Sequence, residues 1–222
     1  MSFTPPEELI VRWQLIHQAL HPDFGMGWNL VLAVSPLVLA LLLFRRQTKP
    51  GLFWWPLLLA FVLLLPNASY TLTDVIHLVA RIRREPHLPV WTVSLVLLPQ
   101  YAAFMFVGLQ SHAFSLILAG RYMRRMGMQR WVIPMEIGVN ILCAVGVYMG
   151  RFQRANSWDV LEAPDELALA TIRDLSDRLP MEIVGCSSVI LITLYYVMKI
   201  FDVALIEYWQ RRIAQWQAPG RF

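Results

Sequence analysis

Long runs of apolar residues, separated by short polar and basic clusters, make up most of this chain. Such runs predict membrane-spanning helices, because about 20 apolar residues are needed to cross the hydrocarbon core of a bilayer. We expect five spans, at residues 26–44, 52–80, 90–118, 131–150 and 181–206. No internal repeat, phosphate-binding glycine loop or low-complexity linker interrupts them. The pattern therefore predicts an all-α integral membrane protein with one domain over residues 1–222.

Two further segments have the pattern of amphipathic helices that lie on a membrane surface. Residues 4–20 start with Thr4 and Glu7 at capping-box spacing and then carry an apolar stripe. Residues 164–179 start with Pro164, which suits the first turn of a helix, and alternate apolar and charged positions at helical spacing. We expect an interfacial helix at each place.

The second expected span contains an irregular stretch, LPNASYTLTDVIHLVARIRR. This span reaches Pro66 after about 14 residues, or roughly 21 Å of helix, against a hydrocarbon core of about 30 Å. We therefore expect a break or kink at Pro66-Asn67, either in a helix that continues or in a re-entrant half-helix. The small polar residues Asn67, Ser69 and Thr71 can bond to the backbone groups freed near the proline.

Polar side chains follow this break at helical spacing. Tyr70, Asp74, His77, Arg81 and Arg84 are four, three, four and three residues apart, so they share one helix face. Thr73 lies beside that face. An aromatic hydroxyl, a carboxylate, an imidazole and two guanidiniums in one stripe predict a binding or catalytic site.

A second polar segment, GRFQRANSWD, follows the fourth expected span. With five spans, the chain leaves the second and fourth spans at the same membrane face. We therefore predict that the two segments converge in one polar pocket. The second segment would contribute Arg151, Arg154, Asn156, Ser157, Trp158 and Asp159.

Composition and charge agree with a membrane protein. Of the 222 residues, 57% are hydrophobic and only 15% are charged. The net charge of +4 comes from short basic clusters that flank the apolar runs, where lipid headgroups lie, so we expect no nucleic-acid partner. Loops on the cytoplasmic side of a membrane protein usually carry more lysine and arginine than those outside. An amino terminus outside places the larger share of the 19 lysines and arginines inside, so we predict that orientation.

The two motifs resemble those of a known family. LPNASYTLTDVIHL is similar to LPNAPYxxTDxxHL, the hallmark of a family of bacterial polytopic membrane proteins called domain of unknown function 1361, and GRFQRANSWD is similar to its second polar segment. Ser69 departs from the pattern, which more usually has proline there. The resemblance implies a multi-span protein of the bacterial cytoplasmic (inner) membrane and supplies no reaction. The matching positions are Pro66, Asn67, Tyr70, Thr73, Asp74, His77, Leu78, Arg151, Asn156, Ser157, Trp158 and Asp159.

The favoured function is binding of an anionic ligand, such as a lipid headgroup or a lipid-linked phosphate, because arginines gather around the expected pocket. The residues expected to bind it are Asn67, Tyr70, Thr73, Arg81, Arg84, Arg151, Arg154, Asn156, Ser157 and Trp158.

Three alternatives stay open. In an enzyme, Asp74 and His77 would act as an acid–base pair, or would bind a metal ion together with Asp159. An accessory subunit would use the polar face to dock a partner in a membrane complex. A small transporter or proton relay would use the polar residues inside the spans, namely Gln100, His112, Glu136 and Asn140. The sequence indicates no particular cofactor.

Overall fold

The computed structural model describes residues 24–45, 50–153 and 164–217. Within these ranges the chain is helical and contains no strand, so the predicted all-α fold is confirmed. The helices are α2 (Phe24–Phe44), α3 (Trp54–Tyr70), α4 (Val75–Arg84), α5 (Val90–Thr92), α6 (Leu98–Arg125), α7 (Val132–Tyr148), α9 (Pro164–Leu175) and α10 (Arg178–Gln217).

Five helical segments are long and apolar enough to cross a membrane, as predicted. They run over Gly25–Phe44, Trp54–Arg84, Val90–Arg125, Gln129–Gln153 and Arg178–Trp216. Several are longer than expected, because helix continues beyond the apolar run into the flanking basic turns. The amphipathic helix expected at 164–179 ends as α9 at Leu175, and Leu179 already belongs to α10. The helix expected at 4–20 lies outside the described residues.

The second span continues through its proline. Pro66 lies inside α3, and the departure from α geometry comes about one turn later, as a 3₁₀ turn at Thr71–Asp74 that leads into α4. Asn67 donates to the carbonyl of Leu64 at 3.0 Å, and Thr71 to that of Ala68 at 2.9 Å. These bonds supply donors to carbonyls around the proline, which has no N–H of its own.

Two π-helical segments lie at the ends of other spans. The first, Val93–Leu97, comes just before Pro99, whose missing N–H leaves the carbonyl of Leu95 without its usual α-helical donor. The second, Met149–Gln153, ends α7 and contains Arg151. A π segment has a wider turn than an α-helix, so Arg151 points in a direction that differs from that of a regular continuation of α7.

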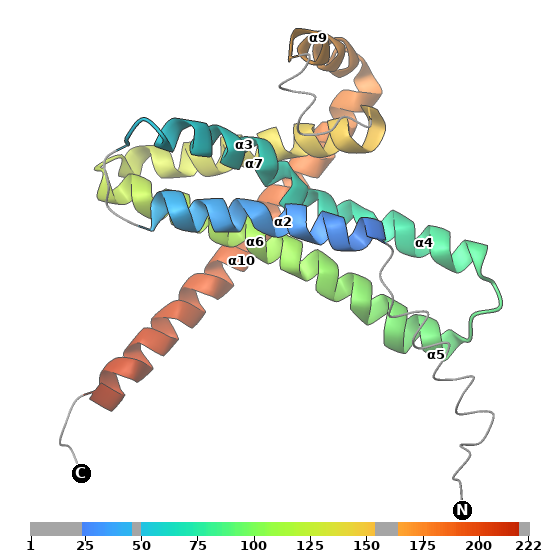
Figure 1. Ribbon diagram of the computed structural model, residues 1–222, viewed down its shortest axis with the longest axis horizontal. Helices are drawn as coiled ribbons and strands as arrows, with labels where there is room; N and C mark the ends of the chain where they lie inside the picture. The colour runs from blue at the N-terminus through green and yellow to red at the C-terminus, as the bar shows by residue number, and fades with distance from the viewer. Residues whose placement is uncertain (1–23, 46–49, 154–163, 218–222) are drawn as a thin grey trace, which may run out of the picture.

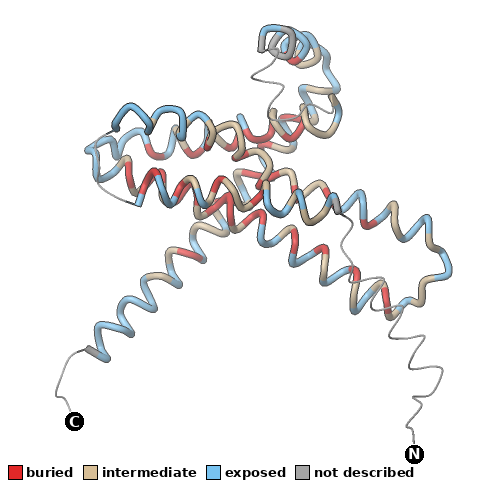
Figure 2. The backbone as a smooth tube through the Cα atoms, viewed as in Figure 1, coloured by how far each residue is buried: buried red, intermediate tan, exposed pale blue. Residues whose placement is uncertain are grey.

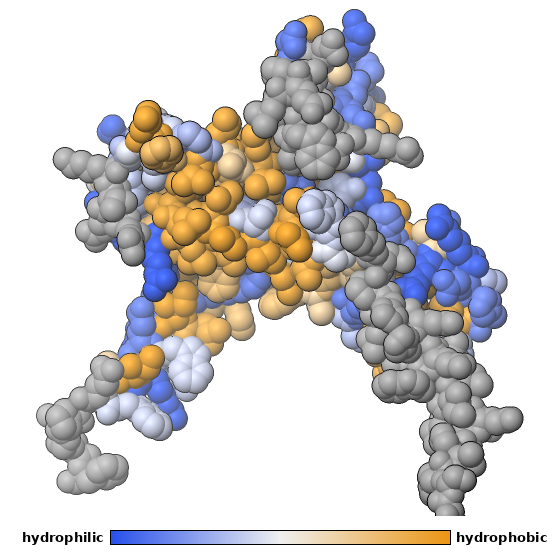
Figure 3. Space-filling view, in the orientation of Figure 1, coloured by the Kyte–Doolittle hydropathy of each residue, from blue (hydrophilic) through white to orange (hydrophobic). Residues whose placement is uncertain are grey.

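The helices α2, α3, α6 and α7 run side by side, and α10 crosses them and packs on α6 and α7 (Figure 1). Buried residues concentrate where these helices meet, whereas the far ends of α4 and α10 are mostly exposed (Figure 2). Hydrophobic side chains cover the central part of the bundle, and hydrophilic ones gather toward α9 and the end of α4 (Figure 3). The apolar exposed surface suits contact with lipid.

Two glycines let the second span approach its neighbours closely. A Cβ on Gly146 of α7 would lie 2.7 Å from the ring of Pro66, and a Cβ on Gly108 of α6 would lie 2.7 Å from the carbonyl oxygen of Ala68. Thr71 would also collide with a side chain on Gly108. Both glycines therefore seat the irregular part of the span against α6 and α7.

Candidate functional site

Arg151 lies at the centre of a polar cluster that joins the second and fourth spans. Its Nη2 donates to Asp74 Oδ1 at 2.9 Å, and its Nε donates to Thr73 Oγ1 at 3.1 Å. Nη2 also bonds to Thr73, and Nη1 lies 3.3 Å from His77 Nε2. The structure thus brings the start of the second polar segment against the first. The planar guanidinium contacts three side chains at once with donors that lie in one fixed plane, a geometry that a lysine ammonium does not offer.

The aromatic ring of Tyr70 completes this arrangement. The guanidinium carbon of Arg151 lies 4.4 Å from the ring centroid, within the range of a cation–π contact. Thr73 donates to the carbonyl of Tyr70 at 2.7 Å, so its hydroxyl oxygen is oriented to accept from Arg151. The 3₁₀ turn thereby places an aromatic face, a hydroxyl and a carboxylate around one cation.

Asp74 is the buried anion of the cluster, with 3% of the residue exposed. Its second oxygen, Oδ2, lies 3.5 Å from Asn29 Nδ2 on α2, at the limit of a hydrogen bond. Asp74 therefore connects the first, second and fourth spans. A buried carboxylate requires such a partner, because transfer of an unpaired charge out of water is costly.

His77 is the exposed member, with 57% of its side chain accessible. Because arginine can only donate, a hydrogen bond with Arg151 requires His77 Nε2 to accept. The same Nε2 lies 3.8 Å from Asp74 Oδ1, too far for a hydrogen bond. Asp74 is therefore the counter-ion of Arg151, and it does not form a hydrogen bond that would orient His77.

The other expected site residues lie elsewhere. Asn67 bonds within its own helix, Arg81 lies 3.9 Å from Glu85 one turn further on, and Arg84 is exposed at the end of α4. In the described part of the chain, no three His, Cys, Asp or Glu side chains come together as metal ligands. The metal set of Asp74, His77 and Asp159 stays a prediction, since its third member is outside that part. Outside it too are Arg154, Asn156, Ser157, Trp158 and Asp159.

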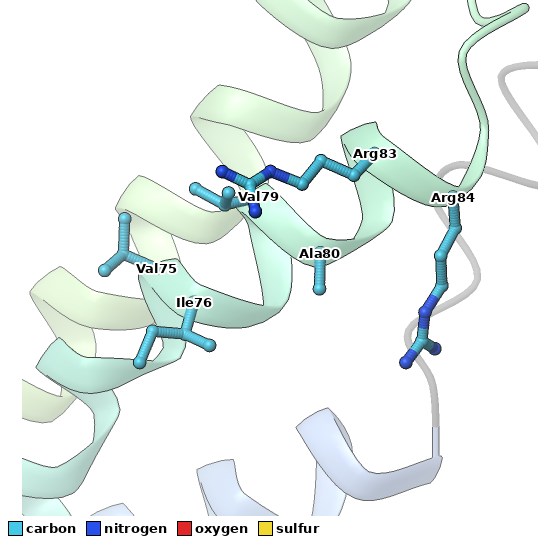
Figure 4. Close-up of a pocket in the computed structure, with 6 residues that line it drawn as sticks. All are labelled: Val75, Ile76, Val79, Ala80, Arg83 and Arg84. Carbon is cyan, nitrogen blue, oxygen red and sulfur yellow. The ribbon is translucent and has the colours of Figure 1, made fainter.

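An apolar groove lies along the face of α4 beyond this cluster (Figure 4). Aliphatic side chains form its wall over two turns; the side chain of Arg83 runs back beside Val79, whereas that of Arg84 points away in another direction (Figure 4). The lining residues are Val75, Ile76, Val79, Ala80, Arg83 and Arg84.

A second polar cluster lies inside the bundle. His112 of α6 contacts Ser69 Oγ through Nδ1 at 3.1 Å and Asn140 Oδ1 through Nε2 at 3.0 Å. Asn140 donates its amide to the carbonyl of Glu136 at 2.7 Å, so its oxygen faces His112. The histidine must therefore donate from Nε2 and accept from Ser69 at Nδ1. Each polar atom in this run has a partner.

Glu136 forms a second buried ion pair between helices of the described bundle. Both of its carboxylate oxygens lie within 2.6 Å of Lys199 Nζ on α10, and the residue is 1% exposed. Of the polar residues that the sequence suggests for an intramembrane path, His112 and Asn140 are directly bonded, whereas Gln100 takes no part in either contact. The sequence did not identify Ser69 as the partner of His112 or Lys199 as the partner of Glu136.

Three other residues that matter to the site were not identified from the sequence. Asn29, Gly108 and Gly146 carry no charge and belong to no motif, and their roles depend on which helices pack together. The role of Lys199 could have been predicted, because it is a lysine within an apolar run. A charged residue at such a position in a membrane needs a buried partner.

Comparison with known proteins identifies the family. The family described as "Protein of unknown function (DUF1361)" matches residues 28–193, which include both polar motifs and most of the five spans. No curated protein and no solved structure matches the chain. The match covers well over half of the 222 residues, as the resemblance of the two motifs predicted. The chain is thus a member of the DUF1361 family, a multi-pass membrane protein whose second and fourth spans meet at Arg151 and Asp74.

Proposed function

We propose that this protein binds an anionic lipid, either through a phospholipid headgroup or through the phosphate of a lipid-linked compound, along α4. The observation that carries the proposal is the groove in Figure 4, where an aliphatic wall and two exposed arginines lie on the same helix. A lipid likewise combines an apolar chain with a charged group. Val75, Ile76 and Val79 would contact the chain, and Arg83 and Arg84 would contact the phosphate.

Charge supports this assignment. Arg83 and Arg84 are exposed, and within the described ranges no carboxylate forms an ion pair with either of them. Arg151, in contrast, is already matched by Asp74 and surrounded by hydrogen-bond partners. The anion would therefore bind to the two α4 arginines, since a guanidinium without a partner can give two parallel hydrogen bonds to phosphate.

In this proposal the Arg151 cluster has a positioning role. Thr73 and Asp74 belong to the turn from which α4 starts, so their bonds to Arg151 hold the first turn of α4 against the end of α7. The groove residues begin at Val75, directly after that turn. Loss of Arg151 would then weaken lipid binding indirectly, by releasing α4.

We further propose that the protein lies in the bacterial cytoplasmic membrane with its amino terminus outside. The basic turns at Arg45 and Arg125 meet at one membrane face, where Arg125 Nη1 donates to the carbonyl of Arg45 at 3.2 Å. The groove lies at the other face, because the chain crosses once between Arg45 and α4. This orientation is tested by introducing single cysteines and labelling them from outside intact cells. We expect a cysteine at position 86 to react and one at position 127 to be protected.

The lipid proposal is tested by comparing the double variant Arg83→Ala/Arg84→Ala with the wild-type protein. Native mass spectrometry of protein mixed with phosphatidylglycerol or phosphatidylcholine would measure bound lipid. At about 1 kcal/mol for each arginine near a headgroup, we expect about 30-fold weaker binding of phosphatidylglycerol and a much smaller change for phosphatidylcholine, whose phosphate charge is balanced by its choline group.

The matched control is Arg211→Ala/Arg212→Ala, which removes two exposed arginines from the end of α10. It should retain the wild-type preference for phosphatidylglycerol. Equal lipid binding by wild type and the α4 variant would refute the proposal. Competition by inorganic phosphate distinguishes a phosphate-specific site from one that requires the lipid chain.

A further inference from the structure

A buried carboxyl group in α10 is separate from both clusters described above. Asp202 is 1% exposed and lies in the fifth span. Gln110 of α6 donates its amide nitrogen to Asp202 Oδ1 at 2.6 Å. This bond joins α6 to α10 inside the bundle, and neither residue belongs to the two family motifs.

The other two oxygens of this pair have no donor. Asp202 Oδ2 and Gln110 Oε1 are both buried, and each lacks a hydrogen-bond partner in the part of the chain that the structure describes. An ionised carboxylate and an amide oxygen can only accept hydrogen bonds. Two unpaired acceptors inside a membrane bundle are unfavourable, because neither water nor lipid hydrocarbon satisfies them there.

We propose that Asp202 and Gln110 form a proton-binding site, in which a proton taken from water resides on Asp202 Oδ2 and is donated to Gln110 Oε1. Asp202 then becomes a neutral carboxylic acid, and the acid and the amide form a cyclic pair with two antiparallel hydrogen bonds. One proton satisfies both unpaired oxygens. A metal cation would require several more oxygen ligands than these two.

The neighbouring charges favour the neutral acid. Among the described residues, the titratable groups that act on α10 from the helices packed on it include Glu136 of α7, which pairs with Lys199, His112 of α6, whose ring lies 6.2 Å from that of Tyr195, and Arg124 of α6, whose charge acts on Tyr195. Lys199 is one turn from Asp202 on α10, but both hydrogen bonds of its ammonium are to Glu136. With a proton on Asp202 the buried charges cancel, whereas without it one negative charge has no partner.

Infrared spectroscopy of the protein in lipid bilayers tests the proposal directly. A protonated carboxyl group gives a C=O band that is separate from the carboxylate and amide bands and shifts in D₂O. At neutral pH we expect this band in the wild-type spectrum and its loss in Asp202→Asn. Glu136→Gln and Glu182→Gln should retain the band, because Glu136 is ion-paired and Glu182 is exposed. A wild-type spectrum from which Asp202→Asn removes no such band would overturn the proposal.

Thermal stability supplies a second test. Asparagine can replace the neutral acid, since its amide donates to Gln110 Oε1 and its oxygen accepts from the Gln110 amide. Asp202→Asn should therefore unfold at nearly the wild-type temperature. Asp202→Ala should unfold well below that temperature. The native state holds a proton that an exposed carboxylate releases, so wild-type stability should fall as pH rises, and less so in Asp202→Asn. Stabilisation of the wild type by sodium ions, absent in Asp202→Asn, would assign the site to a metal cation and contradict the proposal.

Discussion

Among the residues that the structure describes, two buried ion pairs connect different helices, and their contacts differ. Arg151 meets Asp74 at the end of the fourth span and also contacts Thr73, His77 and Tyr70. Lys199 meets Glu136 in the interior, and both of its hydrogen bonds are to the same carboxylate, while its ammonium also lies 5.5 Å and 5.3 Å from the ring centroids of Tyr195 and Tyr196 on its own helix. One cation therefore bonds to several groups of another span, whereas the other bonds to a single carboxylate of another span.

The difference explains the choice of cation at each place. A guanidinium has five donors in a fixed plane and can hold several partners, whereas an ammonium on a flexible chain acts as a point charge. Replacing both members of a buried ion pair by apolar residues is often neutral for stability. We therefore expect the Lys199 pair to be replaceable as a unit and the Arg151 pair not to be.

The largest effect is expected from Arg151→Met. This change leaves Asp74 buried without its counter-ion and also removes the bonds to Thr73, so the free energy of unfolding should fall by about 3–5 kcal/mol. Denaturant unfolding in detergent micelles measures it. The double variant Arg151→Met/Asp74→Asn should recover only part of the loss, and full recovery would show that the additional contacts of Arg151 contribute nothing.

A smaller loss is expected from Lys199→Met. Glu136 loses its counter-ion, but Lys199 forms no other hydrogen bond between helices in the described part of the chain, so we expect the unfolding free energy to fall by about 2–3 kcal/mol. The double variant Lys199→Met/Glu136→Leu should return close to wild-type stability in the same assay. If the double variant is as unstable as the single one, Lys199 and Glu136 contribute more than charge neutralisation. The Lys199 pair would then resemble the Arg151 pair in not being replaceable as a unit.

The packing under the second span gives a third prediction. Gly146→Ala forces a methyl group against the rigid ring of Pro66 and should lower stability by about 1–2 kcal/mol. Gly138→Ala, on the same helix but with nothing within 4 Å of the new Cβ, should gain up to about 1 kcal/mol from helix propensity. Thermal unfolding of both variants measures the difference, and equal melting temperatures would argue against the close approach of α3 and α7.

The smallest effect should come from His77→Ala. His77 is exposed and makes one weak contact with Arg151, so we expect a change of stability within about 0.5 kcal/mol. Retention of phosphatidylglycerol binding by this variant would also agree with a lipid site further along α4. A drop of several kcal/mol would instead place His77 in the structural core of the cluster.

Much of the fold was predictable because the membrane limits what a chain can do. Apolar runs of sufficient length must become helices that satisfy their own backbone, and the five spans follow from this constraint. The helical spacing of Tyr70, Asp74 and His77 also predicted that they share a face, and all three lie around Arg151. Their use as a ligand site stays a prediction.

Other features depend on packing that no local pattern encodes. The sequence placed the irregularity of the second span at Pro66-Asn67, yet α geometry persists through Pro66 and changes at Thr71–Asp74, where the absence of a side chain on Gly108 makes room. Ser69 was expected to bond to nearby backbone but meets His112 of another span. A proline indicates where a donor is missing, whereas the neighbouring helices determine where the chain adjusts.

The most direct test of this account is a double-mutant cycle between Asp74 and Arg151. The free energies of unfolding of the wild type, Asp74→Asn, Arg151→Met and the double variant, measured in the same micelles, give the coupling energy of the two side chains. We predict a coupling of at least about 2 kcal/mol, because the pair is buried and directly bonded. A coupling near zero would show that the second and fourth spans do not meet through these residues, and would contradict the account.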